Sequence, residues 1–325
     1  MPGSQMRREM AEQPEVLARL LSSRIPVDVQ RPAGVIIVAR GSSDHAAVYG
    51  RYLLELATRR PVALAAPSLF TRYGAQTDAS GWLVVGVSQS GRTPEIVDVV
   101  ERLRATGGRA IAITNDEGSP LAEAAETVIG LGAGTEQAVP ATKTFSAQMA
   151  AFAALAAALG DVPWAEGDLA RVPDAVAGVL ADGDGIATLA ERWAEIHQLV
   201  VTARGWLFSA ALETALKVRE TALVSAQGFS VADFLHGPIA AVDPGAPVLA
   251  LRADGPAAAD VDEAVAALTE RGADLQLLPP VDGLPEALAP IAASVRGQQL
   301  ALELALRKGL DPDAPRGLNK VTITR

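Results

Sequence analysis

The chain of 325 residues contains no cysteine and only three histidines, His45, His197 and His236. Without cysteine there can be no disulfide bond, no thiolate zinc site and no cysteine nucleophile. Three histidines scattered along the chain do not favour a histidine-rich metal centre. We therefore expect neither a metal ion nor another cofactor.

Aromatic residues and positive charge are also scarce. Tyr, Phe and Trp make up 4% of the chain, and 28 basic residues face 38 acidic ones, for a formal net charge of -10. No basic run offsets this excess of negative charge. Nucleic acid is therefore not an expected partner, although a few local donors can still hold one small anion.

Long hydrophobic runs are missing as well. No uninterrupted apolar stretch reaches the roughly 18 residues that a membrane-spanning helix needs. The N-terminal sequence MPGSQMRREMAEQPEVLARL carries charges throughout and lacks the apolar segment of a signal peptide. We expect a cytoplasmic protein without a membrane partner.

What the sequence does contain is short apolar runs that alternate with helical patterns. GVIIVA (34–39), WLVVGV (82–87) and AIAI (110–113) are separated by HAAVYGRYLLELA (45–57) and PEIVDVVERLRATGG (94–108). Continuous apolar strands separated by helices of this length are typical of a parallel sheet covered on both faces. The predicted fold class is α/β.

The pattern occurs twice. When the chain is shifted by 164 positions (202 minus 38), VARG (38–41) falls on TARG (202–205) and Gly91 falls on Gly255. Matches at one constant offset without gaps indicate an internal repeat. The sequence thus predicts two α/β domains of one architecture.

A segment rich in glycine, proline and aspartate near 160–185 is expected to join the two domains. We assign residues 1–165 to an N-terminal helix and the first domain. Residues 166–325 are assigned to the second domain and a C-terminal tail.

The loop VSQSGRT (87–93) follows an apolar strand and precedes Pro94. Three hydroxyls and a glycine at the start of a helix suit a phosphate, because backbone N–H groups and the helix dipole add to them. Alternatively, the hydroxyls only cap the helix. The repeat places Arg252–Ala257, which has no hydroxyl, opposite this loop, so only the first loop is expected to bind an anion.

Glu213, Lys217 and Glu220 have the spacing i, i+4 and i+7, which predicts one helix face. An exposed charged stripe would have the same spacing. The surrounding residues are mostly Ala, Leu and Val. Charges on such a helix favour a pocket or an ion pair.

The sequence SQSGRT is similar to the SQSGET phosphate loop of sugar isomerase (SIS) domains, and the tandem layout resembles the isomerase half of glucosamine-6-phosphate synthase. The resemblance covers essentially the whole chain and implies two flavodoxin-like domains, each with a parallel sheet and helices on both faces. Further matching motifs are GSSDHA (41–46), AGTEQAVPATKTF (133–145), ALETALKVRET (211–221), LHGPIA (235–240) and PRGLNK (315–320).

The resemblance implies a binding site for the phosphate and the sugar of a phosphosugar. Val139 would line the sugar, and Lys143 is a weaker candidate cation near the phosphate. The residues implied to hold the phosphate are Ser43, Ser88, Gln89, Ser90 and Thr93.

The resemblance also implies an acid–base set. Glu220 would move a proton between C1 and C2, with Glu213 and Lys217 as its ordering partners. His236 would open the sugar ring from across a dimer interface, which implies a homodimer with shared sites; on its own it could be a loop histidine. Lys320 would form a Schiff base with the open-chain ketose, although a lysine near a C-terminus is usually solvated.

Some residues depart from the family pattern. Arg92 replaces the acidic residue of SQSGET, and Pro140 and Ala141 replace a small polar pair. Gly317 and Asn319 differ within the tail motif. These differences leave the identity of the sugar open.

The absence of cysteine, in a chain that begins Met1-Pro2, excludes the cysteine-dependent glutamine hydrolysis of the synthase. We expect an aminosugar-phosphate deaminase/isomerase that converts glucosamine 6-phosphate to fructose 6-phosphate and ammonia. A deglycase for ketose-amine phosphates such as fructoselysine 6-phosphate, an ammonia-dependent phosphosugar isomerase and a non-catalytic sugar-phosphate sensor remain alternatives.

Overall fold

The computed structural model describes residues 1–23, 25, 27 and 31–320 and contains two compact units. The first unit comprises Glu15–Glu136 and Lys143–Ala170. The second comprises Met1–Pro14, Gln137–Thr142 and Arg171–Lys320. Because these units interleave along the chain, the assignment of 1–165 and 166–325 as domains stays a prediction.

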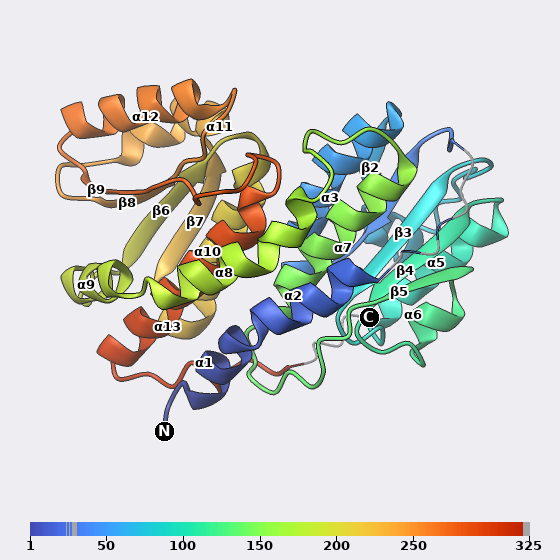
Figure 1. Ribbon diagram of the computed structural model, residues 1–325, viewed down its shortest axis with the longest axis horizontal. Coiled ribbons are helices and arrows are strands. Elements are labelled where there is room, and N and C mark those ends of the chain that lie inside the picture. Colours follow the sequence, from blue (N-terminus) through green and yellow to red (C-terminus); the bar gives the residue numbers. More distant parts are fainter. Residues whose placement is uncertain (24, 26, 28–30, 321–325) are drawn as a thin grey trace. The chain divides into compact units, whose positions relative to one another are not determined.

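The first unit is built on a five-stranded parallel sheet with the strand order β2-β1-β3-β4-β5 (Figure 1). This is the flavodoxin-like order. Its strands are β1 (Val35–Val38), β2 (Val62–Leu64), β3 (Leu83–Ser88), β4 (Arg109–Thr114) and β5 (Thr127–Gly130). The helices of this part of the chain are α2 (Gln13–Ser22), α3 (Ser42–Thr58), α4 (Pro67–Thr71), α5 (Pro94–Ala105), α6 (Pro120–Glu123) and α7 (Lys143–Leu159).

The second unit repeats this arrangement with four parallel strands in the order β7-β6-β8-β9. The strands are β6 (Gln198–Ala203), β7 (Ser225–Ser230), β8 (Pro247–Leu251) and β9 (Asp274–Leu278). Its helices are α1 (Ser4–Ala11), α8 (Val172–Ala181), α9 (Asp184–Arg192), α10 (Phe208–Ala222), α11 (Val231–Leu235), α12 (Ala258–Glu270) and α13 (Ala289–Arg307). The predicted α/β class with a repeated parallel sheet is confirmed.

The repeat offset of 164 found in the sequence carries α3 onto α10 and α5 onto α12 within two residues. Local sequence explains these boundaries. Pro94 occupies the first turn of α5, and Gly107 beyond its end takes the positive φ of 96° that favours glycine. The repeat therefore holds at the level of single elements, not only of fold class.

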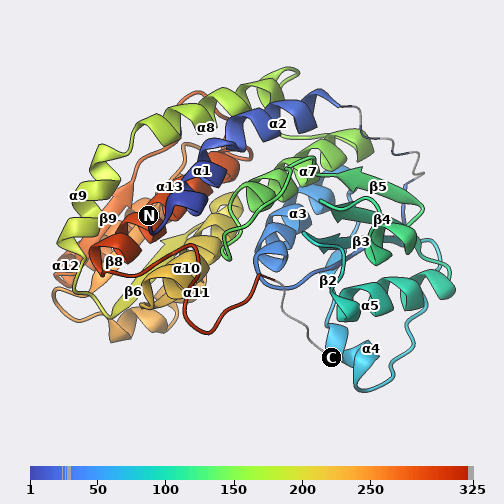
Figure 2. The ribbon, with the colours of Figure 1, turned by 90° about the horizontal axis from the view of Figure 1, so that it is seen from below.

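Helix α7 is apolar around almost its whole circumference because nearly all of it is buried. Figures 1 and 2 both show it beside α3, on which it packs. In the described part of the chain, no helix is both long enough and apolar enough to span a membrane. The hydrophobicity of α7 is thus that of a core helix.

Glycine sets the spacing of the main helix pair in each unit. A Cβ on Gly50 of α3 would lie 2.4 Å from the ring of Phe152 on α7. A Cβ on Gly297 of α13 would lie 2.0 Å from Oγ1 of Thr214 on α10. Neither position has room for a side chain, so the helices approach closely only because these residues are glycine.

We expect Gly297→Ala to lower the free energy of unfolding by about 1–3 kcal/mol, because the added methyl group overpacks the contact between α10 and α13. The matched control is Gly178→Ala in α8, where an added Cβ would meet no atom within 4 Å. This control should stabilise the protein by up to about 1 kcal/mol through helix propensity. Urea denaturation of the two variants measures both effects, and equal effects would contradict the packing argument.

Candidate functional site

The loop VSQSGRT (87–93), which we call the hydroxyl loop, lies at the topological switch point of the first sheet. Strands β1 and β3 are parallel neighbours there, and their connections lead away to opposite sides, to β2 and to β4. Ser43 lies beyond the end of β1, and Ser88 is the last residue of β3, with Gln89–Thr93 after it. Ligands of open α/β sheets bind outside the carboxyl ends of the strands at this point. The fold thus brings together the five residues predicted to hold a phosphate.

Within the loop, Ser88 is buried and its Oγ accepts a hydrogen bond from the backbone N–H of Gly91 at 3.2 Å. The same oxygen lies 3.4 Å from Oγ1 of Thr93. Gly91 has a φ of 62°, which a residue with a side chain adopts at a cost. The chain therefore turns back on itself and directs two hydroxyls to one place.

The alternative that these hydroxyls only cap a helix can be compared with the geometry. Thr93 is the N-cap residue of α5, but its side chain makes no capping hydrogen bond. By contrast, Ser119 caps α6 by accepting from the N–H of Ala122 at 3.4 Å. Capping thus accounts for the hydroxyl of Ser119 and not for that of Thr93.

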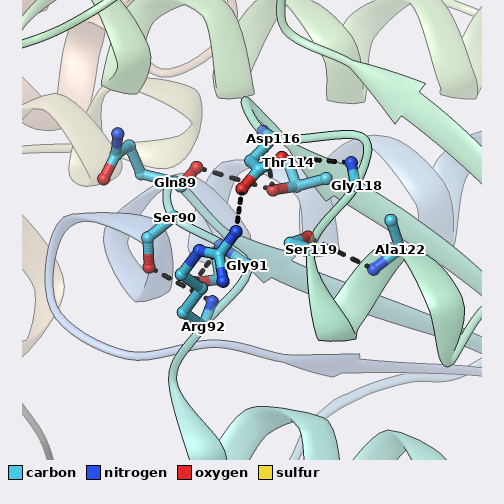
Figure 3. A network of polar contacts seen from close by, with 10 residues as sticks. Gln89, Ser90, Gly91, Arg92, Thr114, Asp116, Gly118, Ser119 and Ala122 are labelled. Carbon is cyan, nitrogen blue, oxygen red and sulfur yellow. Dashed lines mark hydrogen bonds and ion pairs between the residues drawn. The ribbon is translucent and has the colours of Figure 1, made fainter.

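The hydroxyl loop is fastened to the loop that follows β4 (Figure 3). The carbonyl oxygen of Gln89 accepts a hydrogen bond from the backbone N–H of Asn115 at 3.1 Å. The carbonyl oxygen of Gly91 accepts one from the backbone N–H of Leu121 at 3.0 Å. At the exposed edge, Arg92 pairs with Asp116 at 2.7 Å. These contacts hold the loop in one conformation.

The guanidinium of Arg92, together with the N–H of Gly118, lowers the pKa of Asp116 below its ordinary value. The ion pair therefore persists at every pH at which a carboxyl group is normally ionised. It is lost only when the pH falls through the lowered pKa. Arg92, the residue that departs from the SQSGET pattern, is thus paired with a neighbouring carboxylate.

Ser43 has a partner that the motifs did not indicate. Its Oγ accepts a hydrogen bond from Nε2 of Gln148 on α7 at 2.9 Å, and both residues are buried. The available signal was a single glutamine in the apolar stretch FSAQMAAFAALAAAL (145–159). Lys143, the weaker candidate, is also buried, and its Nζ donates to the carbonyl oxygen of Thr135 at 2.8 Å.

The equivalent loop of the second unit is already supplied with carboxylates. Arg252 pairs with Asp254 at 2.6 Å and with Asp262 at 2.8 Å. At the start of α12, the backbone N–H of Ala257 donates to the carboxylate of Glu286, whose pKa is raised by burial. A further anion has little reason to bind there, as the loss of hydroxyls predicts.

On α10, the predicted charged face is buried rather than exposed. Nζ of Lys217 lies 3.3 Å from Oε1 of Glu213 and 2.5 Å from Oε2 of Glu220. The side chains of Lys217 and Glu213 are each 1% exposed, whereas that of Glu220 is 22% exposed. Of the three, Glu220 is therefore the one whose carboxylate can meet a ligand.

Burial of Lys217 by itself lowers the pKa of its amine, but the charges of Glu213 and Glu220 outweigh that effect and raise it above the ordinary value of 10.5. The amine is therefore a permanent cation in the neutral range. Because the folded pKa is the higher one, its charge contributes stability below pH about 10.5 wherever Glu213 and Glu220 are ionised. That contribution is lost as the pH rises through the folded pKa.

The remaining predicted residues lie in the second unit. His236 is exposed directly after α11 and before the turn at Gly237-Pro238. Val139 is half-buried and its N–H donates to the carbonyl oxygen of Asp313 at 3.0 Å. Lys320 is half-buried at the end of the described chain. Among the described residues, no group of three or more His, Asp or Glu could hold a metal ion.

Comparison with known proteins agrees with this architecture. The family model of the SIS domain matches residues 31–158 and 194–278, which together make up more than half of the chain. The chain belongs to the SIS domain family. The two matched segments of this SIS protein correspond to its two sheets.

A relative of this SIS protein is glutamine–fructose-6-phosphate aminotransferase (isomerizing) from Zymomonas mobilis, which is 32% identical over 98% of the chain and 58% of the relative. The chain thus spans a little over half the length of this relative. Solved structures of the same fold include glucosamine-6-phosphate deaminase from Thermotoga maritima, with a TM-score of 0.85, 22% identity and coverage of 99% and 100% of the two chains. Another is tagatose-6-phosphate ketose/aldose isomerase from Escherichia coli, with a TM-score of 0.82, 20% identity and coverage of 100% and 99%.

We expect Lys217→Met to lower the free energy of unfolding by about 3–5 kcal/mol at neutral pH, because it removes the cation between two carboxylates. The loss should shrink as the pH falls toward about 4–5, where carboxyl groups become neutral. The control is Arg102→Met, which removes an exposed i,i+4 pair with Asp98. It should cost less than about 1 kcal/mol. A pH-independent loss in Lys217→Met, measured by urea denaturation, would contradict the ion-pair account.

We expect Arg92→Glu to weaken the binding of inorganic phosphate by about tenfold. The new carboxylate repels phosphate where the guanidinium attracted it, and the ion pair that links the hydroxyl loop to Asp116 is lost. The double variant Arg92→Glu/Asp116→Arg restores an ion pair of reversed sense and should recover most of the affinity. Isothermal titration calorimetry at low and high salt measures both. An unchanged affinity in the single variant would show that Arg92 has no part in the site.

Proposed function

We propose that this SIS protein is an aminosugar-phosphate deaminase/isomerase, and that its substrate is glucosamine 6-phosphate. The observation that carries the proposal is the state of Glu220. Its carboxylate is partly exposed, while the buried cation of Lys217 fixes its position. A fixed carboxylate that reaches solvent suits the transfer of a proton between adjacent carbon atoms.

In the proposed reaction, the hydroxyl loop binds the phosphate and His236 transfers a proton to the ring oxygen as the sugar ring opens. Glu220 then removes the proton from C2 of the open-chain aldose and returns it to C1. A proton of the amine passes to O1 in the same conversion, so that the aldehyde becomes the C1 hydroxyl group and the C2 amine becomes an imine of the ketose. Water adds to that imine and ammonia leaves, so that glucosamine 6-phosphate and water yield fructose 6-phosphate and ammonia.

Lys320 and the partner subunit complete the proposal. In the reverse direction, the amine of Lys320 adds to the C2 carbonyl of the open-chain ketose and water leaves as the Schiff base forms; hydrolysis of that Schiff base returns the free amine. His236 would be supplied by a second copy of the chain, which makes the active form a homodimer. Glu213 supports Glu220 through Lys217, which both carboxylates contact.

The relatives support this choice through the reactions in their names. One is an isomerizing aminotransferase of fructose 6-phosphate and another is a glucosamine-6-phosphate deaminase. A ketose/aldose isomerase of the same fold supports the phosphosugar isomerase alternative. A deglycase for ketose-amine phosphates would use the same loop and base. The proposed reaction and these two alternatives share the phosphate site and the proton transfer.

The test is incubation of the purified protein with glucosamine 6-phosphate while ammonia and fructose 6-phosphate are measured. We expect both products in equal amounts, and a fall in kcat of about 10²–10⁴-fold in Glu220→Gln. The control Glu263→Gln changes an exposed carboxylate of α12 and should keep full activity.

Other outcomes select the alternatives. Interconversion of an aldose and a ketose phosphate without release of ammonia would favour the isomerase. Release of an amino acid from fructoselysine 6-phosphate would favour the deglycase. Binding of phosphosugars without turnover of any, in protein shown to be folded, would favour a sensor and contradict an enzyme.

A further inference from the structure

Gln148 is a buried amide in α7, whose sequence from Met149 to Leu159 is entirely apolar. Its side chain is 1% exposed on α7, and its Nε2 donates to Oγ of Ser43 at 2.9 Å across 105 residues of sequence. Burial of an amide in such a helix is costly unless its hydrogen bonds are satisfied. The contact with Ser43 therefore accounts for a glutamine at this place.

The direction of this hydrogen bond matters for the hydroxyl of Ser43. An amide nitrogen only donates, so Oγ of Ser43 acts as the acceptor and keeps its own proton for another partner. A hydroxyl that already accepts one hydrogen bond also becomes a better donor. Gln148 thus presents Ser43 as a proton donor rather than as an acceptor.

The position of Ser43 gives this donor a target. Ser43 lies in the first turn of α3, where backbone N–H groups and the positive end of the helix dipole are found. A phosphate oxygen accepts hydrogen bonds and, when ionised, cannot donate. The donor direction that Gln148 imposes is therefore the one that an anion at this helix start requires.

The helices themselves hold the pair in place. Gly50 and Phe152 pack one or two turns further along α3 and α7, with no room for a side chain on the glycine. This close packing of α3 on α7 supports the distance between the amide and the hydroxyl. The pair is thus fixed before any ligand binds, which reduces the entropy that binding would otherwise cost.

We propose that Gln148 is a positioning residue of the phosphate site, and that it acts by holding the hydroxyl of Ser43 as a donor to the phosphate of the substrate. The proposal rests on the proposed function, since it assumes that this loop binds a phosphosugar. It predicts that Gln148 affects the affinity for phosphate-bearing ligands and leaves the proton transfer unchanged.

The test is a double-mutant cycle of Gln148→Met and Ser43→Ala, with dissociation constants for inorganic phosphate and glucosamine 6-phosphate measured by calorimetry. Gln148→Met alone should weaken the binding of both by about tenfold, in the range of one hydrogen bond to a charged group. In the Ser43→Ala background it should have no further effect. An undiminished effect in that background, or no effect in either, would overturn the proposal.

Two more variants distinguish loss of the hydrogen bond from a general disturbance of helix packing. Gln148→Glu has the same shape but accepts a hydrogen bond from Ser43. It should therefore weaken phosphate binding more than Gln148→Met does, and the full effect should require Ser43. Met149→Ala removes packing from the same buried helix and should leave phosphate affinity unchanged. If Met149→Ala loses as much affinity as Gln148→Met, the effect is one of packing and the proposal fails.

The kinetic constants provide a separate readout. In Gln148→Met, KM for glucosamine 6-phosphate should rise by about tenfold while kcat stays within about twofold of the wild type. A fall in kcat with unchanged KM would overturn the positioning role. If the wild type binds phosphate and phosphosugars but turns none over, the proposed function fails while the binding cycle still tests Gln148; if it binds neither, both fail.

Discussion

The positive charge of Lys217 can remain buried only because two carboxylates on its own helix contact it. That constraint determines where the two carboxylates of α10 lie. Glu213, at i−4, shares the burial of the amine, whereas Glu220, at i+3, extends toward solvent. One cation thereby stabilises two carboxylates of different accessibility. The spacing of seven residues between the carboxylates separates a supporting role from an exposed one, which a pair of adjacent acids could not do.

The two units use one architecture for different chemistry. At the repeat offset, α10 corresponds to α3, since each follows the first strand of its sheet. In α3 the first turn carries Ser43 at the expected anion site, whereas α10 carries its charged residues further along, inside the helix. The loop after β3 keeps hydroxyls, while the loop after β8 has Asp254, and the carboxylate of Glu286 lies at the next helix start. The two units therefore differ both at the carboxyl ends of their strands and inside the helix that follows the first strand.

Most of the architecture could be predicted because it depends on local patterns. Apolar runs predicted β1, β3 and β4, and the constant offset predicted the repeat. The flavodoxin-like layout was implied by the resemblance to SIS domains. The spacing of Glu213, Lys217 and Glu220 predicted one face, but only the structure shows how the burial is divided among them. The partner of Arg92 was beyond prediction, because Asp116 lies in a loop after a different strand and the contact depends on how two loops meet. Motifs specify the residues of a site, whereas its charge balance depends on tertiary neighbours.

Tertiary contacts of this kind cannot be predicted from motifs, because they depend on glycines that allow helices to approach closely. In the first unit, Gly50 allows α3 to approach α7, and the Ser43–Gln148 hydrogen bond crosses the same helix pair. In the second unit, Gly297 allows α13 to approach α10, and Thr221 of α10 donates to the carbonyl oxygen of Ala301 at 2.9 Å. Short polar side chains reach a facing helix only when the axes are close, and closeness requires a residue without a side chain. The polar contacts that hold the functional helices thus depend on positions that carry no functional group.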